Sequence, residues 1–247
     1  MKIVESIKHR ITHKRKLNKF ISDFKRFKNE EKKTIARFLL EEKDFFACLD
    51  DATVNTGFDR HYVYHVAWAI RTVLKINPVS HTDISGSLHF CSALSAVIPV
   101  DFYDYRPAKL ELSGLKTAAC DLNKLHFKSN SVESISCLHT IEHIGLGRYG
   151  DSIDYDGDLK AMAELKRVVQ PGGSLLFVAP VGKAKIVYNA HRIYSYEQIC
   201  SCFEGFTLRE FSLVPDKEQD GGLIVNASKE LSDAQSYGCG CFWFVKN

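Results

Sequence analysis

Two parts of this sequence carry residues that can move a proton. The segment 138–143 reads LHTIEH and holds His139, Glu142 and His143, while His191 lies in a second polar segment. Histidine suits general acid–base catalysis because its ordinary pKa lies near neutrality. We therefore expect His143 to act as the catalytic base, with His191 and then His139 as alternatives and Glu142 as the acidic neighbour in the catalytic group.

The same segment permits a metal-dependent interpretation. From His139 to His143 the spacing is H-x-x-E-H, the pattern of inverted zinc proteases. That chemistry needs both histidines on one face of a long helix, and Gly145 and Gly147 would end a helix here within a turn. We therefore expect neither a zinc hydrolase nor a bound metal.

Other closely spaced histidines and cysteines are expected to pack without a metal. His61 and His65 stand four residues apart and could share an ion on a helix, or face a substrate pocket if the N-terminal helices cover it. The tyrosines beside them favour an ordinary helix with a polar edge. The remaining pairs have C-x-C spacing instead of the C-x-x-C of common zinc sites, and we expect them to pack beside a sheet: Cys200/Cys202 and Cys239/Cys241.

Short apolar runs alternate with helical patterns from about residue 80, which is typical of a parallel sheet with crossover helices. The clearest helix is Gly157–Val169, and a shorter one covers Tyr196–Phe203. A polar stretch before the last run permits a final antiparallel hairpin. The expected strands are Thr82–Ser85, Val97–Tyr103, Lys116–Cys120, Val132–Leu138, Ser174–Ala179, Thr207–Val214 and Cys239–Val245.

Polar residues follow each of the first five expected strands. In an open parallel sheet, ligands bind outside the carboxyl ends of the strands, near the point where the strand order reverses. These strand ends are therefore where a binding site is expected. They are Asp83 to Ser87, Asp104, Asp121-Leu122, Leu138 to His143 and Pro180 to Gly182.

The N-terminal part of the chain is expected to be helical. Apolar residues at helical spacing predict helices around residues 17–27, 35–49 and 62–74. After the third helix the sequence changes from helical patterns to short apolar runs that alternate with helical patterns. We therefore divide the chain into a basic helical segment, 1–75, and a main domain, 76–247.

Composition and charge limit the class of protein. The chain has 247 residues, 45% hydrophobic and 26% charged, as in a globular protein with a core. It shows neither a run of ~20 apolar residues nor a secretory signal pattern, so we expect a cytoplasmic protein.

The basic charge of the chain is concentrated in its first 33 residues. Residues 1–33 hold 12 Lys and Arg against 4 Asp and Glu, which would allow peripheral contact with an anionic membrane at its inner surface. The evenly spaced aromatics of a single-strand binder are missing, so we expect no nucleic-acid partner.

From about residue 80 to its end the chain resembles the class I S-adenosylmethionine (SAM)-dependent methyltransferases. The segments DLNKLHFKSNSVESISCLHTIEHI and DGDLKAMAELKRVVQPGGSLLFVAPVG match, in order, that family's adenine-site acid, its fourth strand with an E-H pair, and its helix-to-strand turn. IEHIGLGRYGD and YNAHRIYS are similar to a methyltransferase-like subfamily of unassigned function that is associated with surface-glycan genes. The resemblance implies an α/β fold with a Rossmann-like, seven-stranded, mostly parallel sheet, an antiparallel C-terminal hairpin and N-terminal helices.

The resemblance also implies SAM as the cofactor. Asp104 would hold the ribose hydroxyls, since a carboxylate can accept hydrogen bonds from two neighbouring OH groups. Asp121 and Leu122 would contact the adenine, with Leu138 and His139 below it. The loop after the first strand would hold the amino-acid end of SAM through Asp83, Ser85, Gly86 and Ser87.

That loop departs from the family pattern, which is an acid followed by G-x-G-x-G. Only Gly86 is a glycine, and Ser85, Ser87 and His89 occupy the other glycine-like positions. Side chains there remove backbone freedom and fill space that the ligand would use. The alternative is therefore a catalytically inactive protein of the same fold, serving as a binding or assembly module in glycan biosynthesis.

The loops after the fourth and fifth strands are expected to bind the methyl acceptor. Arginine binds carboxylate or phosphate groups through its planar fork. The expected function is SAM-dependent methyl transfer in polysaccharide biosynthesis, to an oxygen of a carbohydrate or another small polar acceptor. The acceptor-binding residues expected here are Arg148, Tyr149, Asn189 and Arg192.

Overall fold

The computed structural model describes residues 2–247, in two units, one ending at Gly57 and one spanning Phe58–Asn247. The second unit therefore begins before residue 76, where the sequence pattern placed the boundary. The reason is helix α2 (Arg60–Ile76), which buries Trp68 and Val73 in the core of the second unit.

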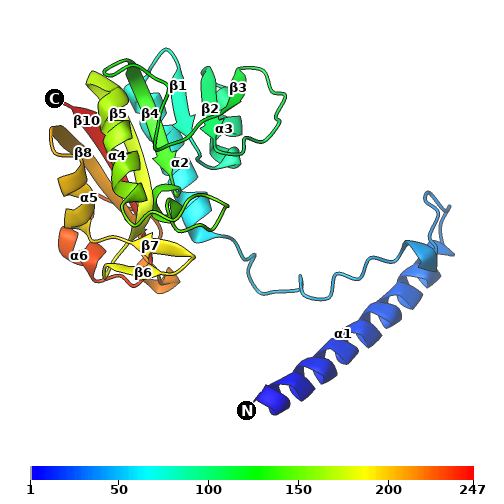
Figure 1. Cartoon of the computed structure of the whole chain (residues 1–247). Helices are drawn as coiled ribbons and strands as arrows, with labels where there is room; N and C mark the ends of the chain where they lie inside the picture. The colour runs from blue at the N-terminus through cyan, green and yellow to red at the C-terminus, as the bar shows by residue number, and fades with distance from the viewer. Residues whose placement is uncertain (1) are drawn as a thin grey trace. The chain divides into compact units, whose positions relative to one another are not determined.

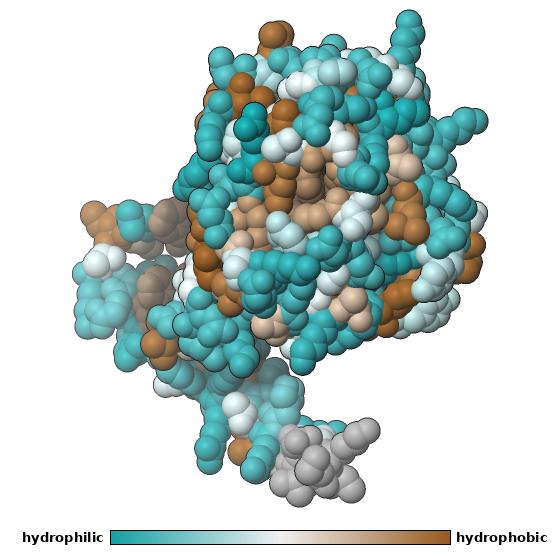
Figure 2. Space-filling view, turned by 90° about the vertical axis from the view of Figure 1, so that its left-hand side faces the viewer, coloured by the Kyte–Doolittle hydropathy of each residue, from teal (hydrophilic) through white to brown (hydrophobic). Residues whose placement is uncertain are grey.

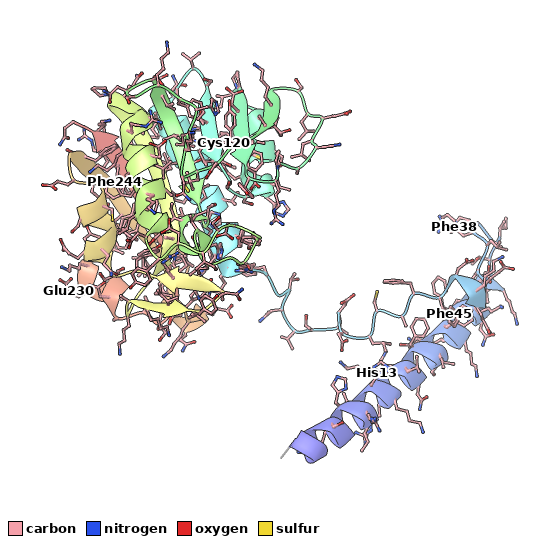
Figure 3. All side chains as sticks on the ribbon, viewed as in Figure 1. His13, Phe38, Phe45, Cys120, Glu230 and Phe244 are labelled. Carbon is pink, nitrogen blue, oxygen red and sulfur yellow. The ribbon has the colours of Figure 1, made fainter. Side chains whose placement is uncertain are left out.

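The first unit is built on one long helix, α1 (Lys2–Glu31). The chain after it contributes Phe45, whose ring packs edge-on against Phe20 and Phe24 of α1, with centroids 5.1 and 4.5 Å apart (Figure 3). Aromatic pairs at such separations stabilise the contact beyond their buried area.

The helix expected over residues 35–49 is wrong, because a single 3₁₀ turn, η1 (Glu42–Asp44), is the only helical structure there. Its apolar residues stay exposed: Ile35 is 91% and Phe46 is 87% accessible to solvent. A short helix is marginal in water unless packing buries its apolar face. The helical spacing is present in this segment, and Phe45 packs on α1, but Phe38 and Leu39 stay exposed like Ile35 and Phe46.

The second unit contains a sheet of eight strands in the order β3-β2-β1-β4-β5-β10-β8-β9 (Figure 1). Strands β1 to β5 are parallel, whereas β10 runs antiparallel between β5 and β8. This confirms the expected mostly parallel sheet with antiparallel C-terminal strands, and adds the short edge strand β9. The strands are β1 (His81–Ile84), β2 (Val100–Asp104), β3 (Leu115–Ala119), β4 (Val132–Leu138), β5 (Val169–Val181), β8 (Phe206–Val214), β9 (Ile224–Val225) and β10 (Gly238–Lys246).

Helices cover both faces of this sheet, and each face has its own core (Figure 1). One core includes Met162 of α4 and Ile199 of α5, and the other includes Trp68 of α2 and Phe90 of α3. The remaining elements are α3 (Leu88–Ser95), α4 (Gly157–Val168), α5 (Tyr196–Cys202), α6 (Lys229–Asp233), the 3₁₀ turns η2 (Ile141–His143) and η3 (Glu218–Asp220), and a separate hairpin of β6 (Lys185–Val187) and β7 (His191–Ile193).

The face of the molecule in Figure 2 is mainly hydrophilic, with a hollowed area in which hydrophobic side chains gather. Over the described residues, the structure contains no helix with the length and apolar character needed to cross a bilayer.

Candidate functional site

A cavity of about 330 Å³ lies beside the carboxyl ends of β1, β2, β3 and β4. Its volume falls in the usual range for small-molecule sites, about 300–1,000 Å³. Seven of the residues expected from the sequence line it, although they come from four separate strand ends. They are Ser85, Asp104, Asp121, Leu122, His139, His143 and Tyr149.

The loop after β1 approaches the cavity through Ser85, which has a left-handed backbone with φ of 53°. That conformation is the one glycine adopts without strain, so the serine holds a glycine-like backbone here. Gly86 cannot be replaced in the same way, because a Cβ on it would lie 2.5 Å from the carboxylate of Asp83. His89 is exposed on α3 and is not among the residues that line the cavity. The space is therefore open despite the departure from the family's glycine pattern.

Asp83 lies beneath this loop and is fully buried. Its carboxylate accepts a hydrogen bond from the Ser136 hydroxyl of β4, and Ser136 also contacts Nε2 of His81 at 2.9 Å. Burial raises the pKa of Asp83 to about 7, although Ser136 and the Gly86 backbone favour its ionised form. Asp83 therefore supports the loop from below and does not itself reach the cavity.

The unchanged protein is expected to lose stability as the pH rises from about 4 to 7, because Asp83 gives up its proton more readily when the chain is unfolded. The Asp83→Asn protein should lack this loss, since Asn does not titrate. The folded protein retains the Asp83 proton above the unfolded pKa of 3.8, so this stabilisation is full below about pH 4 and is lost as the pH rises through 7. The loss amounts to roughly 2–4 kcal/mol. Urea unfolding of both proteins at several pH values measures it. Burial lowers the pKa of nearby His81, which both proteins share, so that contribution cancels. Parallel stability curves for the two proteins would contradict the assignment.

Two carboxylates mark the ends of β2 and β3 at the cavity. Asp104 is half-buried, and its Oδ1 accepts a hydrogen bond from the Arg106 backbone at 2.7 Å. Asp121 is exposed, and its Oδ1 accepts one from the Asn123 backbone at 2.9 Å. Each aspartate thus uses one oxygen to form its own turn and keeps the second for a ligand. The buried Leu122 adds an apolar surface between them.

The loop between β4 and α4 closes another side of the cavity. Asp151 organises it, since its Oδ2 accepts hydrogen bonds from the backbone of Gly145 at 2.8 Å and of Gly147 at 3.3 Å. The loop presents Tyr149, whose ring lies 5.1 Å from the guanidinium carbon of Arg106. That distance is within the range of a cation–π contact, so this contact joins the β2 and β4 loops across the cavity.

Glu142 is buried and acts on a neighbouring histidine. Its Oε1 lies 2.8 Å from Nδ1 of His139. Burial alone would raise the pKa of Glu142, but His139, His143 and a backbone hydrogen bond together hold that pKa below its ordinary value. Burial likewise opposes protonation of His139, but Cys239 and Glu142 raise the pKa of His139 above its ordinary value. Glu142 therefore orients His139 and does not line the cavity.

His143 is the histidine best placed for proton transfer at the cavity. Its Nδ1 lies 2.7 Å from the carbonyl oxygen of Ala190, so Nδ1 carries the proton and Nε2 is left to accept one. The guanidinium of Arg148 donates to the same carbonyl at 2.9 Å. His143 is the last residue of η2, which is a single 3₁₀ turn. The long helix of an inverted zinc protease is therefore absent from this part of the described chain.

Several expected residues lie outside the cavity wall. Leu138 is buried in the core, and Gly86 and Ser87 belong to the loop behind Ser85. His191 packs against Tyr237, with ring centroids 4.8 Å apart, and burial lowers its pKa. Asn189 is exposed on the loop between β6 and β7.

Arg192 supports the β4–α4 loop from the inside. It is 5% exposed and donates to the carbonyl oxygens of Ile144 at 2.6 Å and Tyr155 at 3.0 Å. It also lies 3.5 Å from Asp158. These three contacts occupy its guanidinium, so in this structure it faces protein groups.

A larger hollow of about 810 Å³ lies elsewhere on the unit, beside α4, α5 and β6. Its polar side chains already bond to one another: Arg192 pairs with Asp158, and Ser195 with Gln198 in the cap of α5. The smaller cavity instead lies at the carboxyl ends of the parallel strands, where ligands of such sheets bind, so we assign the functional site to the smaller one.

Some cavity residues were not expected from the sequence. Tyr105 and Arg106 directly follow Asp104, and their position after a strand was the available signal. Tyr62 comes from α2, which places that helix over the cavity; the sequence left this arrangement open for the neighbouring His61 and His65 but did not single out Tyr62. Asp154 also lines the wall, whereas Thr140 and Asp151 lie in loops where the sequence placed the binding site.

The fold of the chain is similar to that of several solved proteins. One is a chain of the complex between the Haloferax volcanii Trm112 methyltransferase activator and a protein described as a methyltransferase: TM-score 0.52, 16% identity, 76% of this chain and 90% of that one. The YcgJ protein of Bacillus subtilis matches with a TM-score of 0.52 and 13% identity, over 75% of this chain and 99% of YcgJ. The N-methyltransferase NodS of Bradyrhizobium japonicum, solved with S-adenosylhomocysteine, matches with a TM-score of 0.50 and 14% identity, over 73% of this chain and 85% of NodS. These likenesses show the Rossmann-like methyltransferase fold.

One family model also matches the chain. It is described as Caenorhabditis protein of unknown function, DUF268, and it matches residues 109–234. A search of the curated proteins found no match. The matched residues include the β3 end, the LHTIEH segment and α4, and therefore much of the cavity wall.

Proposed function

The chain belongs to the DUF268 family and has a methyltransferase fold, and from this premise we propose that it is a SAM-dependent methyltransferase. The observation that carries the proposal is the cavity at the ends of β1 to β4, where Asp104, Asp121 and Leu122 meet the Ser85 loop. Ligands of doubly wound sheets bind at this edge.

The residues present fit the cofactor. Asp104 offers a carboxylate oxygen for the ribose hydroxyls, and Leu122 with Asp121 offers an apolar face and an acceptor for the adenine. Ser85 lines the cavity with a glycine-like backbone, so the loop can approach the amino-acid end of the ligand. When bound, SAM would supply an electrophilic methyl group on a sulfonium sulfur.

His143 would then take the proton from the acceptor. Its Nε2 can accept a proton, because Nδ1 is bonded to Ala190, and the Glu142 carboxylate 3.8 Å from Nε2 would stabilise the resulting charge. Tyr149 lies against His143, with ring centroids 5.6 Å apart, and gives the acceptor an aromatic surface. Arg148 is exposed beside them and would bind an anionic group on the acceptor.

We propose a hydroxyl of a carbohydrate, or of another small polar molecule, as the acceptor. Aromatic and charged side chains at the mouth of the cavity support this class, since sugars stack on aromatic rings and bond through their hydroxyls. The observations at this mouth are the exposed Tyr149 and the two arginines that contact its ring, Arg106 and Arg148. A role in glycan biosynthesis remains part of this proposal.

Calorimetry on the full chain with SAM and with S-adenosylhomocysteine tests the proposal. We expect one site per chain for each ligand and protection of the second unit against thermal unfolding, because a ligand that binds only the folded state stabilises it. Absence of binding by both ligands at millimolar concentration would instead favour the catalytically inactive assembly protein.

A further inference from the structure

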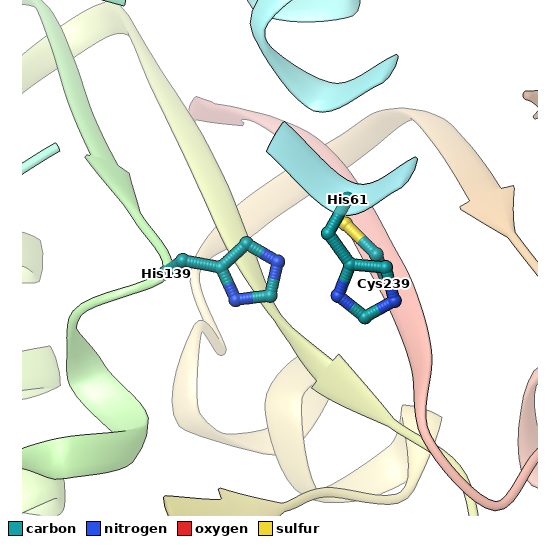
Figure 4. Close-up of side chains that lie close together, drawn as sticks. All are labelled: His61, His139 and Cys239. Carbon is teal, nitrogen blue, oxygen red and sulfur yellow. The ribbon is translucent and has the colours of Figure 1, made fainter. Parts of the chain in front are cut away.

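Three residues that are far apart in sequence bring metal-binding atoms together beside the cavity (Figure 4). His61 comes from the first turn of α2, His139 directly follows β4, and Cys239 lies at the start of β10. One ring nitrogen of each histidine and the Cys239 sulfur all lie within 4.8 Å of one another. A tetrahedral zinc site with two nitrogen ligands and one sulfur has ligand separations of about 3.3–3.6 Å. Side-chain movements of about 1 Å would close this group on an ion.

The backbone and the hydrogen bonds of His139 aim its ring at this group. His139 has a left-handed backbone with φ of 56°, which is uncommon for a residue other than glycine. Its Nδ1 is held by Glu142 at 2.8 Å, while its Nε2 is buried without a hydrogen-bond partner. A histidine that ligates a metal with one nitrogen characteristically bonds a carboxylate with the other. Glu142 thus already fixes His139 in the orientation of a ligand.

Cys239 in the group and the neighbouring His65 are also short of strong partners. Cys239 is fully buried, and its sulfur lies 3.9 Å from that of Cys241, which is at most a weak contact. His65, one turn beyond His61 on α2, is fully buried with both ring nitrogens unpartnered, and its ring centroid lies 5.1 Å from that of His139. A buried polar atom left unpartnered costs about 1–3 kcal/mol. A cation would satisfy the unpaired nitrogen of His139 and the sulfur together.

We propose that His61, His139 and Cys239 bind a zinc ion, with Glu142 as the positioning residue that orients His139. Two imidazoles and a thiolate are typical zinc ligands, whereas magnesium and calcium prefer oxygen. Three protein ligands leave a fourth position open, as in zinc sites that bind water or substrate.

The site lies next to the cavity and shares His139 with the residues expected below the adenine, but it includes neither Asp104, Asp121 nor the Ser85 loop. His139 belongs to both, and Tyr62, the neighbour of His61, lines the cavity wall. The ion would therefore lie near the expected acceptor. The zinc proposal does not depend on methyl transfer, because binding can be measured on the chain without SAM.

Titration of the metal-free full chain with zinc tests the proposal, with cobalt(II) as a spectroscopic substitute. We expect one ion per chain and, with cobalt, a charge-transfer band from thiolate to metal. Cys239→Ala should abolish the band and the tight binding. Cys241→Ala is the matched control, because Cys241 is equally buried two residues along the same strand, and it should keep both. Glu142→Gln should weaken zinc binding about 10- to 100-fold.

His61→Ala serves as a second ligand variant, since His61 is only partly buried at the start of α2 and its removal leaves the core intact. It should lose the tight binding while its circular dichroism matches that of the unchanged chain. Failure of the unchanged chain to bind stoichiometric zinc would overturn the proposal. Equal affinities of the Cys239→Ala and Cys241→Ala proteins, or an unaltered affinity in folded His61→Ala, would overturn it as well.

Discussion

Asp104→Asn is expected to weaken SAM binding about 10- to 100-fold, because hydrogen bonds to a charged group contribute about 1.5–3 kcal/mol each. Asn keeps an oxygen for the Arg106 backbone, so the turn after β2 is preserved. What changes is the second atom, which becomes an NH₂ group and cannot accept a hydrogen bond from a ribose hydroxyl. Calorimetric titration with S-adenosylhomocysteine measures the effect without turnover.

Asp101→Asn provides the control for charge. Asp101 lies on the same strand as Asp104 and is not among the residues that line the cavity. Its replacement removes the same formal charge and should leave the affinity within about 2-fold of the original. If both variants bind equally well, the ribose assignment of Asp104 is wrong, whatever the effect on stability.

Gly145→Ala is expected to lower the stability of the second unit by about 3–5 kcal/mol. Gly145 has φ of 79°, and a Cβ there would lie 2.0 Å from the backbone carbonyl oxygen of Asp154. The backbones of Gly145 and Asp154 cannot easily move apart, because Asp154 also donates its backbone N–H to the Gly145 carbonyl at 2.9 Å. Both residues line the cavity, so the substitution should also reduce ligand binding. Thermal and urea unfolding measure the first effect.

Gly150→Ala separates backbone conformation from collision. Gly150 lies in the same loop with a similar φ of 84°, but nothing lies within 4 Å of the position of its Cβ. Its replacement should lower the free energy of unfolding only by the cost of holding Ala in a left-handed backbone, about 1–2 kcal/mol. Equal losses in the two variants would mean that the loop relaxes around the methyl group added at Gly145 and that the close approach to Asp154 is unimportant.

The regular elements of the second unit were largely predictable from the sequence. The β4 run Val132–Leu138 was predicted to the residue, because its apolar residues form a strand-length run between polar turns. The hairpin of β6 and β7 was missed, since all three residues of β6 are exposed and leave no burial pattern. The segment 35–49 shows the opposite failure, where helical spacing occurs but side chains such as Ile35 and Phe46 have no surface to pack on.

The candidate site was predictable where topology alone brings residues together. Parallel strands end at one edge, so Asp104, Asp121 and His139 could be placed near one another without knowing any contact. Contacts within the protein could not be foreseen. The bonds that occupy Arg192 depend on how the β4–α4 loop folds, and the meeting of His61 with Cys239 depends on where α2 packs.

The place of β10 between β5 and β8 has a consequence for biosynthesis. Both neighbours are made earlier on the ribosome, and neither can complete its hydrogen bonding until Gly238–Lys246 has been added. The nascent unit therefore exposes the open edge of β5 once Val181 has been added, and that of β8 as well once Val214 has been added, until β10 is made. Such open strand edges invite pairing with other chains. Closure of the sheet is a late event, so molecules whose synthesis stops early should be aggregation-prone targets for chaperones and proteases.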